Sequence, residues 1–406
     1  MPDHLVTGMP YDKMSFLAGI AAGRNMRSWP TMEYGTNVFC FTLLVSESTF
    51  NRYVFTATFS GTIYWGDRTS ETGSWTGRIE HTYSIEGLIQ VMLVGDLTDI
   101  CFSLGYFSII NDMLISIDSP LPPIPQSYPR PIQRTLQNHF FGCRNLISIP
   151  DGYFDKWFED DLVIIDSENL FAYCEMASLP DHIFDKIKLA SGVRLLDMFS
   201  HSAIAELPDD LFSSEEFRKV SNIAGMFDGC DNLYSLSNNL FANFSGATNA
   251  AALFRDCSRL SSVSSDLLSG LVGATTIEGL FSGSGLTSIP SGLFVGLNSV
   301  TSARNCFYGT KIGSIGAMAL EGLNNLHDAS FMFYGCLRLT SVSSSVFDNL
   351  PITNFEYCFY NDRAITSEVP ELWISHPGAT GTNCFTRCTN AYNYQDIPSS
   401  WGGPST

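Results

Sequence analysis

The chain has 406 residues and is acidic, with 22 Lys and Arg against 41 Asp and Glu and a formal net charge of −19. It has no run of Lys and Arg, so it lacks the positive field that non-specific binding to nucleic acid or anionic lipid requires, and neither partner is expected. No apolar run approaches the roughly 20 residues of a membrane-spanning helix, so membrane insertion is not expected either.

Residues 1–33 form the first predicted segment, whose one apolar run covers residues 15–24. A secretory signal peptide has a basic start, but Asp3 and Asp12 precede this run and only Lys13 is basic. The segment is therefore interpreted either as a short packing helix or as a docking segment that is ordered only against a partner.

Residues 16–29 read FLAGIAAGRNMRSW, and this stretch resembles the short leader at the start of many bacteriophage virion proteins. The resemblance implies assembly into a phage particle, with this leader as the attachment end. Gly19 and Gly23 are four residues apart, so in a helix they would share one face and permit close packing. The predicted attachment residues are Phe16, Leu17, Gly19, Gly23, Arg24 and Trp29.

Residues 34–104 form a predicted β module, because stretches such as 38–45 and 53–59 are rich in β-branched and aromatic residues. Trp65-Gly66-Asp67-Arg68-Thr69, followed by His81-Thr82-Tyr83, resembles the PKD-like β-sandwich module, although Arg68 replaces the usual glycine. In that family these residues are structural, and the resemblance implies that Asp67 and His81 tie the turn to a neighbouring strand. The predicted turn residues are Trp65, Asp67, Thr69, His81 and Tyr83.

The Asp67 and His81 pair would also suit catalysis, but the spacing assigns no Ser or Cys nucleophile to it. The chain has no Walker loop, no Gly-x-Ser-x-Gly elbow and no His-Glu-x-x-His motif. A non-enzymatic protein without a cofactor is therefore expected.

Residues 105–138 form a predicted proline-rich joint. Prolines 120, 122, 123, 125, 129 and 131 fall close together, and proline at this density stiffens a linker into extended conformations. Residues 113–118 look like a degenerate repeat strand and would serve as an N-terminal cap, which a solenoid needs because its end coil exposes an apolar face.

Residues 139–406 form a predicted solenoid. An anchor phenylalanine recurs at spacings of 26 to 31 residues, and a fixed period in this range indicates stacked coils. The anchors are Phe140, Phe171, Phe199, Phe227, Phe254, Phe281, Phe307, Phe333, Phe359 and Phe385. The four apolar side chains of one coil cannot offset the entropy of ordering it, so neighbouring coils must stack their anchors in an interior column.

The pattern F-x-G-C-x-x-L-x-S-I-P-x-x-L-F resembles the leucine-rich repeats of BspA-like surface proteins, with the clearest copies at 227–233 and 333–339. The resemblance implies adhesion and protein recognition, without catalysis. Asp362 departs from the pattern, because it stands at an interior position that most coils fill with Cys. A carboxylate at that position is expected to be paired or to lie at an edge.

Six of the 11 cysteines stand three residues after an anchor, and three more stand directly before one. A metal or disulfide framework would not distribute cysteines one per coil, so reduced, buried thiols are expected and no metal site is predicted.

A polar column runs between the two aliphatic positions of each predicted strand, and it is the candidate contact face. Its residues are Ser148, Tyr234, Ser235, Ser262, Ser288, Ser314 and Ser341. Two interpretations stay open: a plain solvated ladder, or a surface that contacts another protein or a glycan.

The predicted fold class is mainly β with irregular and short helical coils, a PKD-like β-sandwich followed by a leucine-rich-repeat solenoid of about ten coils. The predicted function is that of a non-enzymatic phage structural protein of the tail or baseplate, assembled in the host cytoplasm and anchored by its N-terminus. Its solenoid would contact a protein or glycan for host-surface recognition or adhesion. Expected partners are other virion proteins, further copies in a symmetric assembly, and a host surface protein or glycan. The alternatives are a bacterial cell-surface leucine-rich-repeat adhesin and a purely architectural virion subunit.

Overall fold

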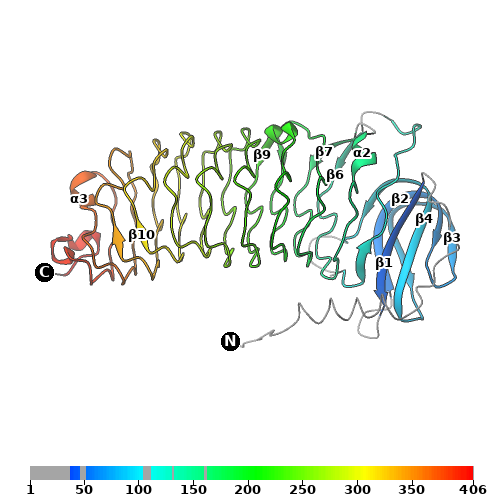
Figure 1. Cartoon of the computed structure of the whole chain (residues 1–406), viewed down its shortest axis with the longest axis horizontal. Helices are drawn as coiled ribbons and strands as arrows, with labels where there is room; N and C mark the ends of the chain where they lie inside the picture. Colours follow the sequence, from blue (N-terminus) through cyan, green and yellow to red (C-terminus); the bar gives the residue numbers. More distant parts are fainter. Residues whose placement is uncertain (1–36, 46–51, 104–110, 130–131, 160–161, 406) are drawn as a thin grey trace.

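The computed structural model describes residues 37–45, 52–103, 111–129, 132–159 and 162–405. A β-sheet module lies at one end and continues into a long solenoid that ends near the C-terminus (Figure 1). No helix in these residues is long and apolar enough to cross a membrane.

The sheet module is a five-stranded antiparallel sheet with strand order β3-β2-β4-β1-β5. Its strands are β1 (Val38–Val45), β2 (Arg52–Tyr64), β3 (Ser70–Thr82), β4 (Gly87–Cys101) and β5 (Leu114–Ile117). Alternation along β2 buries Tyr53, Phe55, Ala57 and Phe59, so one face of the sheet is apolar. The sequence predicts a two-sheet sandwich here, whereas the described strands form a single sheet whose apolar face is covered by the solenoid.

The sheet and the solenoid share one core. Phe102, just after β4, stacks on the first anchor, Phe140, with ring centroids 5.5 Å apart and planes 5° apart. Phe39 of β1 lies 6.4 Å from Tyr153 of the first coil. The sheet therefore acts as the N-terminal cap of the solenoid, which would otherwise expose its first apolar coil.

The predicted joint is packed rather than free. β5 pairs with β1 in the sheet, and its Ser116 bridges in parallel to Ser148 of the first coil. Leu121 and Ile124, within the proline-rich stretch, are each 1% exposed. This stretch therefore joins the two parts through contacts, and the domain boundaries given above stay predictions.

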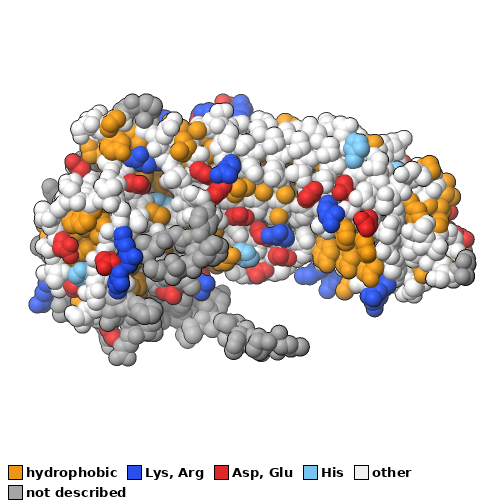
Figure 2. Space-filling view, turned by 180° about the vertical axis from the view of Figure 1, so that it is seen from behind, with side chains coloured by type: hydrophobic (Ala, Val, Ile, Leu, Met, Phe, Trp, Pro, Cys, Tyr) orange, Lys and Arg blue, Asp and Glu red, His pale blue; other side chains and the backbone are white. Residues whose placement is uncertain are grey.

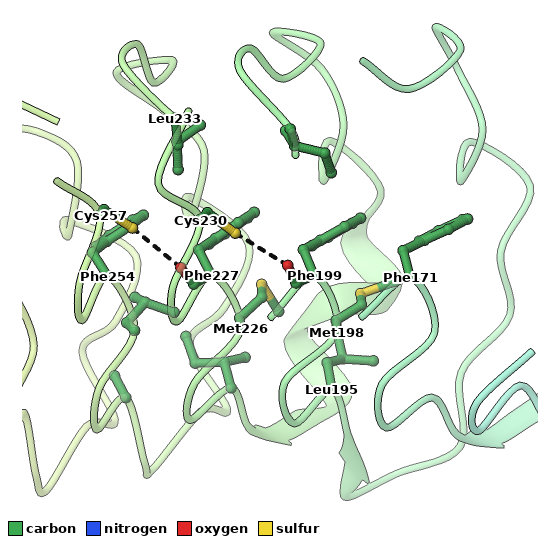
Figure 3. Packing of buried hydrophobic residues seen from close by; sticks show 14 of the residues in the cluster. Phe171, Leu195, Met198, Phe199, Met226, Phe227, Cys230, Leu233, Phe254 and Cys257 are labelled. Atoms are coloured by element: carbon green, nitrogen blue, oxygen red, sulfur yellow. Dashed lines mark hydrogen bonds between the residues drawn. The ribbon is translucent and has the colours of Figure 1, made fainter. Parts of the chain in front are cut away.

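The anchor phenylalanines form one continuous column. All ten are 0% exposed, and consecutive rings lie 5.3–5.8 Å apart with planes 3–11° apart. Figure 3 shows this stacking from Phe171 to Phe254. The predicted stacking of anchors in an interior column is confirmed.

Short parallel pairings connect the coils on their two faces. One series of parallel bridges joins Asn222, Asn249, Thr276, Ser302, Asp328, Asn354 and Thr380 in turn. The named elements of this region are β6 (Ile132–Thr135), α2 (Asp155–Glu159), β7 (Leu162–Asp166), β8 (Val193–Arg194), η1 (Glu215–Lys219), β9 (Val220–Asn222), β10 (Ser314–Ile315), β11 (Ser341–Val342), α3 (Leu372–Ser375), η2 (Tyr394–Asp396) and η3 (Ser399–Trp401). The predicted fold class, mainly β with irregular and short helical coils in a solenoid, is confirmed.

The cysteine column links neighbouring coils. The Cys230 thiol donates to the carbonyl oxygen of Phe199 at 3.1 Å, and the Cys257 thiol donates to that of Phe227 at 3.1 Å (Figure 3). All eleven cysteines are free. The thiols of Cys174, Cys336 and Cys388 donate in the same way to the anchor carbonyl of the preceding coil, so a small weak donor fits this position inside the apolar core.

Asp362 corrects one expectation. Its side chain is 0% exposed, and neither carboxyl oxygen has a hydrogen-bond partner in the described residues, so it is neither paired nor at an edge. Burial raises its pKa well above the ordinary value. A protonated, neutral carboxyl therefore replaces the carboxylate that would be too costly to bury.

The C-terminal end of the column is also covered. The Phe385 N–H donates to the Trp401 carbonyl oxygen at 2.9 Å, as the other anchors do to the next coil. The Trp401 ring lies 6.1 Å from Phe355 and 6.5 Å from Trp373. Gly381 leaves room for this ring, because a Cβ there would come within 2.0 Å of it.

Candidate functional site

The predicted attachment residues Phe16, Leu17, Gly19, Gly23, Arg24 and Trp29 lie outside the described residues. Their role in attachment to a virion therefore stays a prediction.

The predicted turn residues of the sheet module come together in space. Asp67 Oδ2 lies 2.8 Å from His81 Nε2, and its Oδ1 accepts hydrogen bonds from the N–H and hydroxyl of Thr69. The His81 ring stacks on Trp65 at 4.5 Å, and the Tyr83 hydroxyl donates to the Trp65 carbonyl oxygen at 3.1 Å. These contacts tie the β2–β3 turn to the end of β3.

The electrostatics of this turn suit an anchoring role. Burial opposes ionisation of Asp67, but the hydrogen bonds from Thr69 and His81 outweigh it, so the pKa of Asp67 is lowered. The carboxylate therefore stays charged and accepts all of these bonds. The His81 ring is covered by Trp65 on one side and by Tyr83, at 4.7 Å, in an edge-to-face contact. These contacts hold the ring in place as part of the turn.

The predicted contact face is exposed. Six of its seven residues, all but Ser341, are exposed, and Ser341 is half-buried. Backbone hydrogen bonds run across this face from coil to coil, for example from Thr287 N–H to Ser261 O at 3.1 Å and from Gly313 N–H to Thr287 O at 3.1 Å. The backbone is thus satisfied internally, and a partner would meet a row of small hydroxyl side chains.

A second surface, which sequence patterning does not single out, lies along the turns that carry the anchors. Each anchor turn has one residue with φ between 50° and 71° two positions before the phenylalanine and another two positions after it. We call the exposed outer surface of these turns the anchor-turn edge. Asn, Asp and Gly fill most of these left-handed positions, as steric hindrance requires.

Four ring residues are exceptions, because bulky side chains rarely adopt the left-handed region: Tyr173, His201, Phe331 and Tyr357. Tyr173 stacks on His201 at 4.8 Å. Phe331 and Tyr357 stack on each other at 4.9 Å and lie beside a second stack of Tyr308, Tyr334 and Tyr360, whose successive rings are 4.8 and 4.9 Å apart. We call Tyr308, Phe331, Tyr334, Tyr357 and Tyr360 the aromatic ladder. A non-glycine residue in the left-handed region carries backbone strain of order 1–3 kcal/mol, and it keeps that conformation only where surrounding interactions stabilise it. Such residues cluster at functional sites.

Cations border the aromatic ladder. The Arg304 guanidinium lies 4.6 Å from the centre of the Phe331 ring, and that of Arg387 lies 5.5 Å from the Tyr360 ring. The cationic half of the anchor-turn edge consists of Arg304, Lys311, Arg338, Arg363 and Arg387. Within the described residues none of them has a carboxylate within 4.0 Å, whereas Arg52, Lys186, Arg218 and Arg255 all do.

The preceding coils give the same edge the opposite charge. Its acidic half consists of Asp197, Asp228, Asp231 and Asp256. Arg255 pairs with Asp228 through two guanidinium nitrogens, yet burial and repulsion by Asp228 still raise the pKa values of Asp197 and Asp256. The four aspartates outnumber Arg255 and Arg259 of the same turns, so negative charge is in excess there. Figure 2 shows acidic side chains over the middle of the solenoid and, nearer its C-terminal end, a hydrophobic patch bordered by Lys and Arg side chains.

One group among the described residues has the donors for a metal ion. His182 Nδ1 lies 3.0 Å from Asp185 Oδ2 and 3.0 Å from Asp210 Oδ2. The three side chains are well exposed, and their ion pairs account for the arrangement. Exposed groups of this kind are common without an ion.

No protein-family model matches the chain, and no curated protein matches it. Among solved structures, the chain is similar to a chain of the Toll–Spatzle complex from Drosophila in its glycosylated form, with 17% identity over 59% of this chain and a TM-score of 0.32. That match spans 33% of the Toll-complex chain. The chain is also similar to the leucine-rich repeat domain of the type III effector XopL, with 15% identity, 67% of this chain, 75% of that chain and a TM-score of 0.32.

Proposed function

We propose that the chain is a non-enzymatic structural protein of a bacteriophage tail or baseplate, and that its solenoid is a contact surface for protein or glycan. The N-terminal segment attaches it to the virion, and the solenoid serves host-surface recognition or adhesion. The protein would be assembled in the host cytoplasm as part of a symmetric oligomer.

The anchor-turn edge carries the contact role. Tyr and Arg are enriched at protein interfaces and dominate their binding energy. Here they gather on the cationic half of this edge, whose cations have no carboxylate within 4.0 Å among the described residues, whereas Arg255 of the acidic half pairs with Asp228. Leaving these cations in water costs the free protein little. A partner that places carboxylate or other hydrogen-bond acceptors opposite them would stabilise the complex.

The resemblance of residues 16–29 to phage virion leaders carries the virion role. The test is to measure the amount of the chain in gradient-purified particles. We expect the chain in particles, and we expect the double variant F16A/W29A to be lost from them while R218A, a surface variant of the solenoid, stays. A chain found on the bacterial surface and absent from particles would contradict the proposal and favour the adhesin.

Mass spectrometry of the native N-terminus provides a second test. A peptide that retains residues 11–24 supports the virion role, whereas a mature chain beginning near Gly23 indicates export. To separate host recognition from a purely architectural role, residues 139–406 are replaced and both assembly and adsorption are measured. Particles that assemble but no longer adsorb support recognition, whereas failure of assembly supports architecture.

A further inference from the structure

The opposite charges of the anchor-turn edge follow the coil repeat. The cationic half occupies the coils of Phe307, Phe333, Phe359 and Phe385, which also carry Glu356. The acidic half occupies those of Phe199, Phe227 and Phe254, which also carry Arg255 and Arg259. The coil of Phe281 lies between them. Both halves have the same spacing between coils, because one continuous ring column sets it.

The central coil carries small side chains close to its anchor on this edge, and Glu278 stands at the repeat position that Arg304 occupies in the next coil. Gly279, Ser282, Gly283 and Gly285 surround its anchor. Space above Gly283 is already used by Asp256, since a Cβ on Gly283 would lie 2.1 Å from Asp256 Oδ1. Lys311 of the following coil also reaches across this coil, because its Nζ donates to the carbonyl oxygen of Ser258 at 3.4 Å. Side chains of both charges therefore meet at the centre of the edge.

We propose that the anchor-turn edge binds the same edge of a second copy of this chain, in antiparallel orientation, about a two-fold axis at the coil of Phe281. The axis places the Phe254 coil opposite the Phe307 coil, the Phe227 coil opposite the Phe333 coil, and the Phe199 coil opposite the Phe359 coil. The acidic half of each copy then meets the cationic half of the other, as an isologous interface requires.

Individual pairs follow from this arrangement. Asp231, four residues after its anchor, lies opposite Arg338, five residues after its own, and Asp256 lies close to Lys311 of the other copy. The phenol hydroxyls of Tyr308, Tyr334 and Tyr360 have no hydrogen-bond partner among the described residues, and the opposing carboxylates supply acceptors. Every contact occurs twice, once on each side of the axis.

The geometry of the ladder favours a protein occupant over a nucleic acid. Single-stranded nucleic acids bind by stacking bases on free aromatic faces. The faces of the Tyr308, Tyr334 and Tyr360 rings cover one another at 4.8–4.9 Å, so no base fits between them. Their edges remain, and ring edges carry partial positive charge that adds to the field of the arginines.

The test uses charge reversal on the full chain, measured by sedimentation velocity at low and high salt. R338E places a glutamate against Asp231 twice per dimer, and D231R places two arginines against Arg338. We expect each single variant to weaken the dimer by at least about tenfold, because like charges face each other across the interface. The double variant R338E/D231R restores opposite charges on both sides and is expected to recover the wild-type dissociation constant.

Mixing the two single variants is an independent test. An R338E chain and a D231R chain together place opposite charges at both contacts, so a heterodimer is expected although neither homodimer is stable. R218E, which lies outside the anchor-turn edge, is the matched control and should leave the dimer unchanged. Circular dichroism of every variant checks that the fold is retained.

Two results would overturn the inference. One is a wild-type chain that sediments as a monomer at micromolar concentration and low salt. The other is a double variant no better than the single ones. A monomer that binds an added acidic polysaccharide, and loses it in R338E, would assign the cationic half to an anionic glycan instead. This inference refines the oligomer in the proposed function, but it is tested on purified chain, so its failure leaves the virion experiments unaffected.

Discussion

Asp362 allows a direct test of how burial in the solenoid core changes the pKa of a carboxyl group. It occupies the interior position that Cys336 fills in the preceding coil and Cys388 in the next. The nearby amides of Gly335 and Cys336 already donate to Tyr360 O and Phe333 O, so neither carboxyl oxygen receives a hydrogen bond. Burial therefore raises the pKa of Asp362 well above its ordinary value of 3.8.

The sign of the pH effect follows from linkage. Below about pH 4 the carboxyl is protonated in both states, and ionisation contributes nothing to stability. Above that pH the unfolded chain loses the proton while the folded chain keeps it. The free energy of unfolding then falls by about 1.4 kcal/mol per pH unit until the pH reaches the raised pKa. D362N keeps the shape of the side chain and removes the titration.

We expect D362N to be increasingly more stable than wild type as the pH rises, by about 1.4 kcal/mol for each unit above pH 4. Urea unfolding at intervals between pH 4 and pH 7 measures the difference. D348N, the same substitution at an exposed position, is measured alongside as the control. A constant difference for D362N, or one that shrinks with rising pH, would mean that Asp362 is ionised and paired in the folded chain, and would refute the reasoning.

Three further predictions concern the column and its ends. Burial lowers the pKa of His139 to about 3, so wild type should lose about 1.4 kcal/mol of unfolding free energy per unit as the pH falls below about 6.5, and H139M should lack that slope in urea unfolding. F227A should cost roughly 3–5 kcal/mol, because it leaves a cavity between two stacked rings; urea unfolding showing less than about 1 kcal/mol would contradict this. W401A should speed amide hydrogen exchange in the Phe385 coil and leave the Phe199 coil unchanged; equal effects on both coils would show that Trp401 is not a local cap.

The interior of the solenoid is predictable from sequence because every coil packs against its neighbours in the same way. A ring at one height can stack only on a ring at the same place in the next coil, so the anchors repeat and their period is visible. The cysteine column is visible for the same reason. The solenoid itself and the burial of its anchors could therefore be derived without the structure.

The ends of the column could not be derived in this way. Phe102 stacks on Phe140, but it belongs to the sheet module and follows no repeat motif. Trp401 covers the other end from outside the repeat pattern. Each cap makes its contacts once, so periodicity contains no information about it. The proline-rich stretch is predicted to be a stiff linker, whereas its Leu121 and Ile124 are buried. Their burial involves no repeated motif, so periodicity does not predict it either.

The aromatic residues of the anchor-turn edge recur in the sequence with the coil period, but only the structure shows that they form one surface. Tyr308, Tyr334 and Tyr360 each directly follow an anchor, so they repeat with the coil. Phe331 and Tyr357 stand two residues before an anchor, where most coils have Asn, Asp or Gly. The repeat alone does not reveal that this position is left-handed, and without that fact an aromatic residue there looks unremarkable.

The two exposed surfaces differ in what they can specify. The contact face predicted from sequence repeats serine in almost every coil, so a partner shifted by one coil would make nearly the same contacts. Such a surface does not determine which coil of the solenoid a given part of the partner contacts. The anchor-turn edge changes from acidic to small to aromatic and cationic along the solenoid, so a shift by one coil would leave charges unpaired or facing like charges. Specific recognition requires that wrong arrangements be costly, and the anchor-turn edge meets this requirement whereas the serine face does not.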